Sequence, residues 1–143
     1  FYIGGTKVGA LFGEAVVFTN TTLGEAFFTE IKQHGALLAK GRMLGIQFDE
    51  LFEDNLYIKI AKHAVDLAMR IKRELTDKGY EFYNDSYTNQ QFPIISKAKL
   101  DAIQDKVILD DWGPYGDDDR RLVRITTSWA TTEEAVDTLL KLL

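Results

Sequence analysis

The sequence predicts an α/β protein whose first part holds a buried strand and long helices and whose second part holds short strands and two helices. Three patterns lead to this prediction. Short apolar runs flank a glycine-rich turn near the start, as strands do. Apolar side chains then recur at helical spacing as far as Gly79. Beyond that residue, short apolar runs alternate with turn residues, which is typical of a small α/β layer.

The first part begins with a strand-like run that leads into the glycine-rich turn. The turn carries one lysine, Lys7, between Gly5 and Gly9. Residues 10–18 then predict a mostly buried strand, because they are short, apolar and followed by a cluster of turn residues. A buried strand needs neighbours on both sides, and a single hairpin is marginal in water. We therefore expect the chain to be the C-terminal portion of a larger protein.

Helical periodicity covers the middle of the chain. The spacing predicts a helix that breaks near Gly35, a second helix over residues 36–52 and a long third helix. Asp54 or Asn55 is placed to cap the third helix, and Gly79 is placed to end it. The second helix is rich in apolar side chains, which indicates burial or a subunit interface. These are Leu37, Leu38, Met43, Leu44, Ile46, Phe48, Leu51 and Phe52.

The second part predicts four short strands and two helices. The strands are expected over residues 80–83, 92–96, 107–112 and 122–129. A short helix is expected over residues 97–105. Thr131 and Glu134 have the spacing of a capping box, which predicts that the last helix begins there.

Composition excludes several classes of function. The net charge is −5, and no basic run is interleaved with aromatic residues, so we expect no nucleic-acid partner. No apolar run approaches the roughly 20 residues that span a bilayer, and the start lacks the features of a signal peptide. We expect a cytoplasmic protein with no membrane partner. The absence of cysteine excludes disulfides, thiol nucleophiles and zinc–thiolate sites.

Five aspartates near the end of the chain do not predict a metal site. Asp110, Asp111 and residues 117–119 flank a Gly-Pro-Tyr-Gly turn. The ligand spacing of an EF-hand is absent. A solvated hairpin is the simpler interpretation, so we expect no metal.

The spacing around Lys7 leaves three roles open for this lysine. A lysine in a glycine-rich turn can contact phosphate, lie in solvent or act as an amine nucleophile. The segment is not a P-loop, because Gly-Lys-Ser/Thr is missing, and it lacks the Gly-x-Gly-x-x-Gly order of a dinucleotide turn.

Several separated segments carry a family pattern in a fixed order. They are residues 1–18 with Gly4-Gly5-Thr6-Lys7, residues 32–42 with Lys32-Gln33-His34-Gly35, residues 45–48, residues 88–93, and residues 123–131 with Val123-Arg124-Ile125-Thr126. Together they resemble the threonine aldolase and β-eliminating lyase family, which are pyridoxal-phosphate enzymes of the aspartate-aminotransferase fold. The resemblance covers essentially the whole chain.

This resemblance implies a fold and a domain organisation. The chain would be the C-terminal part of a pyridoxal-phosphate-dependent transferase-like fold. Residues 1–54 would form the end of the large cofactor-binding domain, and residues 55–79 a long connecting helix. Residues 80–143 would form a small α+β domain with a mostly antiparallel sheet.

The resemblance also implies which residues form the site of the cofactor, pyridoxal 5′-phosphate. Lys7 would form the Schiff base with the cofactor aldehyde. Gly4, Gly5 and Thr6 would lie beside the cofactor, with Thr6 as a candidate donor to its phosphate or ring. Simple turn chemistry explains Thr6 equally well.

Arg124 matches the arginine that binds the substrate carboxylate in this family. Its planar fork can grip a carboxylate through two hydrogen bonds. Arg121 is the second candidate, and its offset of three residues places it on the opposite face of the strand. The alternative for Arg124 is a surface arginine paired with one of the aspartates at 117–119. Lys32 and Gln33 occupy positions near the family's active site, although a pair on a helix surface explains them as well.

The resemblance implies an enzyme of amino-acid metabolism that acts on a small amino acid. A threonine aldolase, which converts threonine to glycine and acetaldehyde, is the preferred hypothesis. A β-eliminating lyase similar to tryptophanase or tyrosine phenol-lyase, or an aminotransferase, is the first alternative. A fragment that only associates with a partner and binds no cofactor is the second. We expect a homodimer or homotetramer, with the ring-stacking residue and general base upstream, and little activity from this chain alone.

Overall fold

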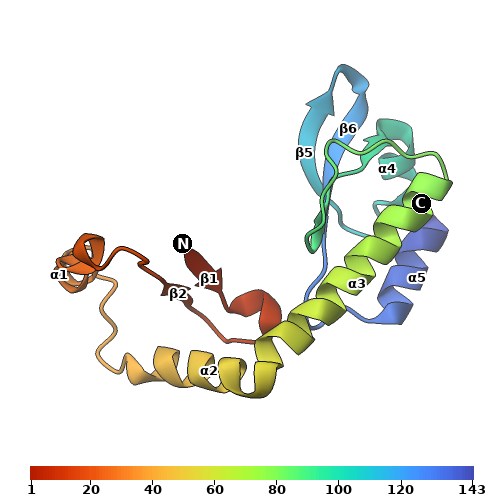
Figure 1. Cartoon of the computed structure of the whole chain (residues 1–143). Helices are drawn as coiled ribbons and strands as arrows, with labels where there is room; N and C mark the ends of the chain where they lie inside the picture. The colour runs from red at the N-terminus through yellow and green to blue at the C-terminus, as the bar shows by residue number, and fades with distance from the viewer. The chain divides into compact units, whose positions relative to one another are not determined.

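A computed structural model describes the chain from Phe1 to Leu143 and divides it into two units, Phe1–Lys59 and Ile60–Leu143 (Figure 1). Helix α3, Leu56–Asp77, begins in the first unit and continues into the second. No helix combines the length and the apolar character that crossing a membrane requires. The domain boundaries expected at residues 54 and 79 stay a prediction.

The first unit contains a small ribbon of two strands and two helices. Its elements are β1 (Tyr2–Gly4), a 3-10 turn (Thr6–Val8), β2 (Glu14–Val16), a second 3-10 turn (Thr21–Gly24), α1 (Phe27–Gln33) and α2 (Arg42–Phe52). The two strands are antiparallel, and Tyr2 lies opposite Val16.

The prediction of a mostly buried strand over residues 10–18 is wrong. β2 holds three residues, pairs with β1 alone, and none of residues 10–18 is buried. Gly13 has a φ of +96°, which lies outside the extended region and delays the start of the strand. With one neighbour in the sheet, the apolar side chains of this segment stay partly or fully exposed.

The helical break predicted near Gly35 is confirmed, but the second helix starts later than expected. Gly35 has a φ of +68° and donates to Lys32 O, while Ala36 N donates to Ile31 O. Together these bonds close the end of α1 in a Schellman motif. Ala36 therefore serves to end one helix and cannot begin the next, and α2 starts at Arg42.

Few of the apolar side chains on α2 are buried within the chain. Phe48 and Leu51 are buried, and with Val8 they are the buried hydrophobic side chains of the first unit. Several large hydrophobic side chains of this unit are more than 40% exposed. These include Leu11, Leu23, Phe28, Leu37, Leu38, Met43, Ile46 and Phe52.

Helix α3 begins and ends where the sequence predicts. Asp54 and Asn55 precede it, but they adopt left-handed φ values of 48° and 59° and make no capping hydrogen bond with their side chains. The predicted cap is therefore wrong, although its position is right. At the other end, Gly79 N donates to Thr76 O at 2.9 Å and Tyr80 N donates to Leu75 O at 3.0 Å. This Schellman motif needs the φ of +85° at Gly79.

The second unit contains one antiparallel sheet with β6 at its centre. Its strands are β3 (Gln90–Gln91), β4 (Ile94–Ser96), β5 (Asp110–Tyr115) and β6 (Asp117–Thr126). Arg121 of β6 lies opposite both Ile95 and Pro114, so β4 and β5 lie on opposite sides of it. The predicted strand over residues 80–83 is wrong, because Phe82 makes only an isolated bridge to Pro93. Tyr80 is instead used in ending α3.

Helices α3, α4 (Lys97–Ile103) and α5 (Glu133–Leu142) pack their apolar side chains against one face of this sheet. The buried core consists of Leu67, Ile71, Leu75, Ile95, Ile103, Val123, Ile125, Val136, Leu140 and Leu143. The residue that caps α5 is Thr132, whose Oγ1 accepts from Ala135 N at 3.1 Å. The capping box predicted at Thr131 is therefore wrong by one residue, because Thr131 Oγ1 accepts from Ser128 N instead.

Two buried polar residues join the sheet to its surroundings. Thr127 Oγ1 donates to Ala64 O of α3 at 2.6 Å, and Asn89 Nδ2 donates to Thr127 O at 2.6 Å. Gln91 is fully buried and donates through Nε2 to Thr88 O at 3.0 Å, while its Oε1 has no partner. The uncharged bond from Thr127 to Ala64 O fixes the end of β6 against α3.

Candidate active site

Lys7 lies in a tight turn that presents its side chain outward. It occupies the 3-10 turn Thr6–Val8, in which Val8 N and Ala10 N both donate to Gly5 O, at 3.1 and 3.0 Å. Val8 is 5% exposed and anchors the turn. The side chain of Lys7 is exposed and makes no hydrogen bond or ion pair. No side chain or backbone group of the structure therefore occupies its primary amine.

The backbone of this turn passes too close to its neighbours for a side chain at Gly5. A Cβ atom there would lie 2.7 Å from Ala10 Cβ and 3.1 Å from Phe48 Cζ. Gly5 is buried, whereas Gly4 has nothing within 4 Å of the equivalent position. Thr6 is exposed and its hydroxyl makes no hydrogen bond. The two glycines thus differ: Gly5 is required by packing, and Gly4 borders open space.

Two side chains outside the turn hold its flanks in place. Tyr57 donates its hydroxyl to Gly4 O at 3.0 Å. Gln47 of α2 accepts from Leu11 N at 2.7 Å through Oε1 and donates to Met43 O at 2.9 Å. The segment around Lys7 is therefore attached to α2 and to the start of α3.

In the second unit, Arg124 of β6 is held by three side chains. Its Nε and Nη2 lie 2.7 and 2.6 Å from Asp110 Oδ2, and its Nη1 donates to Gln90 Oε1 at 3.4 Å. The guanidinium carbon lies 5.1 Å from the centre of the Trp112 ring. Asp110 and Arg124 are opposite residues of the β5–β6 hairpin. The alternative that paired Arg124 with the aspartates at 117–119 therefore named the wrong partner.

Arg121 forms a similar pair three residues earlier. Its Nε lies 3.1 and 3.0 Å from the two oxygens of Asp111, and its Nη2 lies 2.9 Å from Oδ2. The hydrogen bonds from Arg121 hold the pKa of Asp111 below its ordinary value, with a smaller contribution from Gly113 N. Both oxygens of Asp111 are thus used by Arg121.

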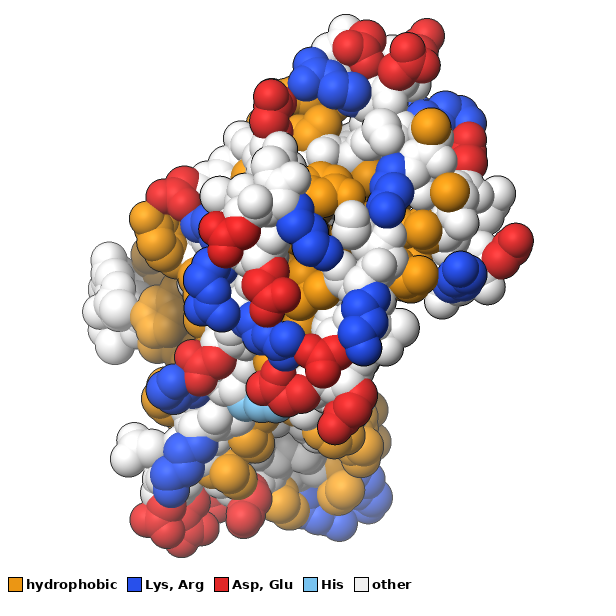
Figure 2. All heavy atoms as spheres, turned by 90° about the vertical axis from the view of Figure 1, so that its right-hand side faces the viewer, with side chains coloured by type: hydrophobic (Ala, Val, Ile, Leu, Met, Phe, Trp, Pro, Cys, Tyr) orange, Lys and Arg blue, Asp and Glu red, His pale blue; other side chains and the backbone are white.

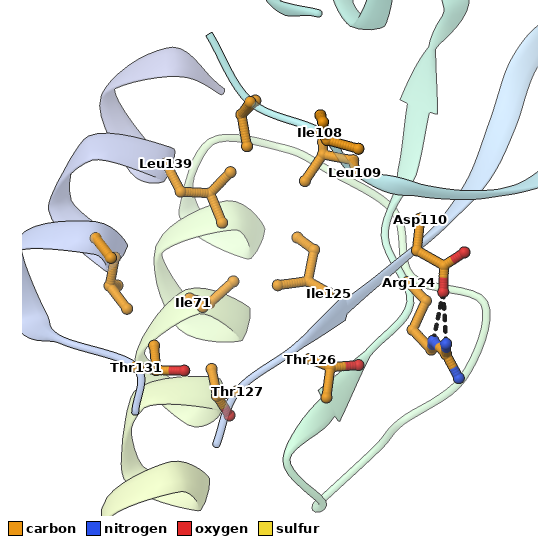
Figure 3. A pocket seen from close by; sticks show the side chains of 13 residues that line it. Ile71, Ile108, Leu109, Asp110, Arg124, Ile125, Thr126, Thr127, Thr131 and Leu139 are labelled. Atoms are coloured by element: carbon orange, nitrogen blue, oxygen red, sulfur yellow. Dashed lines mark hydrogen bonds and ion pairs between the residues drawn. The ribbon is translucent and has the colours of Figure 1, made fainter. Parts of the chain in front are cut away.

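A cavity of about 390 Å³ lies beside Arg124 (Figure 3). Its inner wall is apolar, with Ile71, Ile125 and Leu139, while Thr126 and Thr131 add hydroxyl groups. Figure 3 shows the Asp110–Arg124 pair at one side of this cavity. Its size would hold a small organic molecule. Arg121 does not line it.

Comparisons with known proteins cover nearly the whole chain. The chain is 33% identical over 134 residues to a low specificity L-threonine aldolase of Pseudomonas sp. (strain NCIMB 10558), over 93% of this chain and 38% of that protein. A low specificity L-threonine aldolase of Pseudomonas aeruginosa is 29% identical over 134 residues, which again cover 93% of this chain and 38% of that protein. A solved structure of Leishmania major threonine aldolase matches with a TM-score of 0.90 and 36% identity, over 99% of this chain and 41% of that one.

The chain is homologous to the threonine aldolases. It spans about two fifths of the length of these relatives. The match to the solved structure confirms that the α/β fold expected from the resemblance is part of the threonine aldolase fold. A scan against protein-family models gives no match.

The remaining site candidates, Lys32 and Gln33, lie on the surface, and so do the two histidines, to which the sequence assigns no role. Lys32 and Gln33 are exposed near the end of α1 and make no side-chain hydrogen bond. His34 is exposed, and its Nε2 lies 3.7 Å from Glu30 Oε2. His63 Nε2 lies 2.8 Å from Thr131 O and ties α3 to the loop before α5.

The five aspartates near the end of the chain all lie in the β5–β6 hairpin. Nowhere in the structure do three histidine, aspartate or glutamate side chains gather in a way that would hold a metal ion. Figure 2 shows acidic and basic side chains interleaved over the visible face, with hydrophobic side chains between them. Pairing with arginine accounts for Asp110, Asp111 and Asp117.

The residues around Arg124 were not identified from the sequence. Asp110 and Trp112 lie on β5 and Gln90 lies on β3, and only the pairing of these strands with β6 brings the three side chains to one guanidinium. The register of the hairpin shifts between Asp111 and Pro114 and again between Pro114 and Tyr115, so counting back from the turn does not place Asp110 opposite Arg124. The bulge therefore hides this pairing from the sequence.

Proposed function

We propose that this chain forms the C-terminal part of a pyridoxal-phosphate-dependent threonine aldolase, a lyase that converts threonine to glycine and acetaldehyde. The observation that carries the proposal is the homology to L-threonine aldolases over 93% of the chain. The chain spans 38% of that relative, so the remaining site residues would come from a longer polypeptide.

The chemistry of the Lys7 turn fits the cofactor. Lys7 would hold it, because its amine is exposed and has no competing partner. The free hydroxyl of Thr6 and the open space at Gly4 would accommodate its polar groups. Pyridoxal 5′-phosphate, when bound, supplies an electron-accepting ring for the pair left on Cα when a bond is broken.

Arg124 would bind the carboxylate of the amino-acid substrate. A planar guanidinium fixes a carboxylate through two parallel bonds, which also fixes the orientation of Cα. This orientation favours cleavage of one bond at Cα, while the β-hydroxyl loses its proton. Arg124 is preferred to Arg121, since it borders a cavity and because Arg121 is engaged by both oxygens of Asp111.

We also propose that the complete protein is a homodimer or homotetramer. The support is the set of large hydrophobic side chains left exposed on α2 and its neighbours. Surfaces of this kind mark contacts with other parts of a protein or with a second copy.

The proposed function is tested in the full-length protein that contains this chain. Purified with its cofactor, it should release acetaldehyde and glycine from L-threonine. Lys7→Ala should abolish turnover and also the covalent adduct trapped on the protein by borohydride. Lys40→Ala, which changes an exposed lysine of the same unit, should keep both. Absence of the adduct in the parent protein would favour the alternative of an association module.

Product analysis separates the enzyme alternatives. Release of indole from tryptophan or phenol from tyrosine, together with pyruvate and ammonia, would indicate a β-eliminating lyase, and amino transfer to a keto acid would indicate an aminotransferase. The 143-residue chain by itself should show no turnover of threonine. Turnover by this chain that Lys7→Ala abolishes would contradict the proposal that other site residues are needed.

A further inference from the structure

The guanidinium of Arg124 is fixed on two edges and covered on one face. Asp110 Oδ2 binds the edge formed by Nε and Nη2, at 2.7 and 2.6 Å, and Gln90 binds Nη1 at 3.4 Å. Trp112 covers the guanidinium and also donates Nε1–H to Asp110 Oδ2 at 3.2 Å. One carboxylate oxygen therefore holds both the arginine and the ring that lies against it.

These contacts leave part of the arginine unused. A guanidinium has five N–H donors, with two on each terminal nitrogen. Asp110 takes the Nε donor and one on Nη2, and Gln90 takes one on Nη1. One N–H on each terminal nitrogen remains. A bidentate grip on another carboxylate needs two parallel N–H groups, one on each terminal nitrogen. The Gln90 bond leaves this pair free when it uses the Nη1 hydrogen that points away from Nη2.

We propose that Asp110 is the positioning residue for Arg124, holding the guanidinium so that one N–H on each terminal nitrogen is presented to the carboxylate of the substrate. This inference rests on the proposed function and deepens it. Gln90 and Trp112 assist by fixing Nη1 and by covering one face. A guanidinium held in this way loses less conformational freedom when the substrate binds, and so binds it more tightly.

The Arg121–Asp111 pair provides the internal comparison. It lies on the same hairpin and has the same residue types. Arg121, however, donates to both carboxylate oxygens of its partner and does not border the cavity. Exposed ion pairs contribute little to folding stability. The side chains of Asp110 and Arg124 are 47% and 37% exposed. Removing Asp110 should therefore affect carboxylate recognition much more than folding.

The test measures how strongly the full-length enzyme prefers a carboxylate. The ratio of kcat/KM for L-threonine to kcat/KM for L-threonine amide isolates the contact that differs between the two substrates. Asp110→Ala should lower this ratio roughly tenfold to hundredfold, the range of a hydrogen bond to a charged group. Asp110→Asn, which keeps the shape and one acceptor, should lie between this variant and the parent. Asp111→Ala should leave the ratio within about twofold of the parent.

Three results would overturn the inference. An unchanged ratio in Asp110→Ala would show that Arg124 needs no positioning. A higher ratio would show that Asp110 competes with the substrate for Arg124. An equal loss in Asp111→Ala would show that any ion pair of the hairpin has the same effect.

A second measurement does not depend on turnover. In full-length protein labelled with ¹⁵N-arginine, the Nε–H resonance of Arg124, assigned by its loss in Arg124→Lys, should shift when L-threonine is added. The shift should persist in Asp111→Ala and disappear in Asp110→Ala. An equal shift in both variants overturns the positioning role. If L-threonine shifts the Arg124 resonance but no acetaldehyde is released, Asp110 keeps its positioning role and the proposed aldolase reaction is wrong.

Discussion

Gly5 is the residue on which the geometry of the Lys7 turn depends. Its carbonyl accepts two backbone bonds, and the place of its missing side chain is filled by Ala10 and Phe48. Lys7 can be placed in an exposed turn because the residue two positions earlier is buried and has no side chain. The sequence indicates both Gly4 and Gly5 as site candidates. Only the structure shows that Gly5 is required by packing, whereas Gly4 borders open space.

Gly5→Ala should destabilise the first unit. The added methyl would lie 2.7 Å from Ala10 Cβ, so the backbone or Phe48 must move, at a cost of about 1–3 kcal/mol. Urea unfolding of the 143-residue chain measures this change in free energy. Gly4→Ala is the matched control, and it should change the free energy by no more than about 0.5 kcal/mol. Equal losses in the two variants would contradict the packing role.

At the scale of elements, the long helix was the most predictable part of the chain. Its apolar stripe, from Ala64 to Leu75, is buried as the spacing predicts. Strands were harder to predict, because residues 10–18 and 80–83 have strand-like composition but lack partners along their length. Pairing depends on residues distant in the sequence, which local pattern does not contain.

The cap of α5 allows a test at the level of one element. Thr132→Ala removes the Oγ1 that accepts from Ala135 N, and should lower the free energy of unfolding by about 1 kcal/mol. Thr138→Ala is the control. Its hydroxyl bonds back to Glu134 O inside the same helix, so alanine should be neutral or slightly stabilising there. Thermal unfolding of both variants checks the difference. A larger loss of stability in Thr138→Ala than in Thr132→Ala would contradict the assignment of Thr132 as the cap.

At the scale of the whole molecule, the two units differ in how much apolar surface they bury. The first unit buries Val8, Phe48 and Leu51, whereas the second has a continuous core shared by three helices and a sheet. The first unit also carries most of the exposed large hydrophobic side chains. We therefore expect the first unit to be the less stable of the two in this chain.

Hydrogen exchange should show this difference directly. In the 143-residue chain, amides of α3 beyond Ile60 and of β6 should exchange slowest, and amides of β1, β2 and α2 should exchange faster. Mass spectrometry of peptides after exchange measures both sets. Equal protection in the two units would contradict the expectation.

Acid should weaken the second unit through its ion pairs. The hydrogen bond from Lys72 lowers the pKa of Asp85, with Tyr87 adding to it, and Arg121 lowers the pKa of Asp111. A carboxylate whose pKa is lower in the folded state stabilises the fold above the ordinary value of 3.8. That contribution is lost as the pH falls through the folded-state pKa.

The Tm should therefore fall as the pH drops below about 4. Asp111→Asn should flatten this part of the profile, whereas Asp118→Asn, which changes a carboxylate without an ion pair, should leave it unchanged. Calorimetry from pH 7 to pH 2.5 provides the comparison. A profile that Asp111→Asn does not alter would remove this pair as a source of acid sensitivity.

The uncharged bonds of Thr127 should respond to ionic strength differently from the substrate contact proposed for Arg124. Hydroxyl and amide bonds between neutral groups are little affected by dissolved salt, whereas an exposed guanidinium and its carboxylate are screened by it. The bond from Thr127 Oγ1 to Ala64 O, which attaches the end of β6 to α3, should therefore hold in concentrated salt, as should the bond from Asn89 Nδ2 to Thr127 O. Under the same conditions, the arginine three residues earlier on the strand would lose much of its attraction for an anion. Salt would weaken binding at this site before it weakened the strand that carries it.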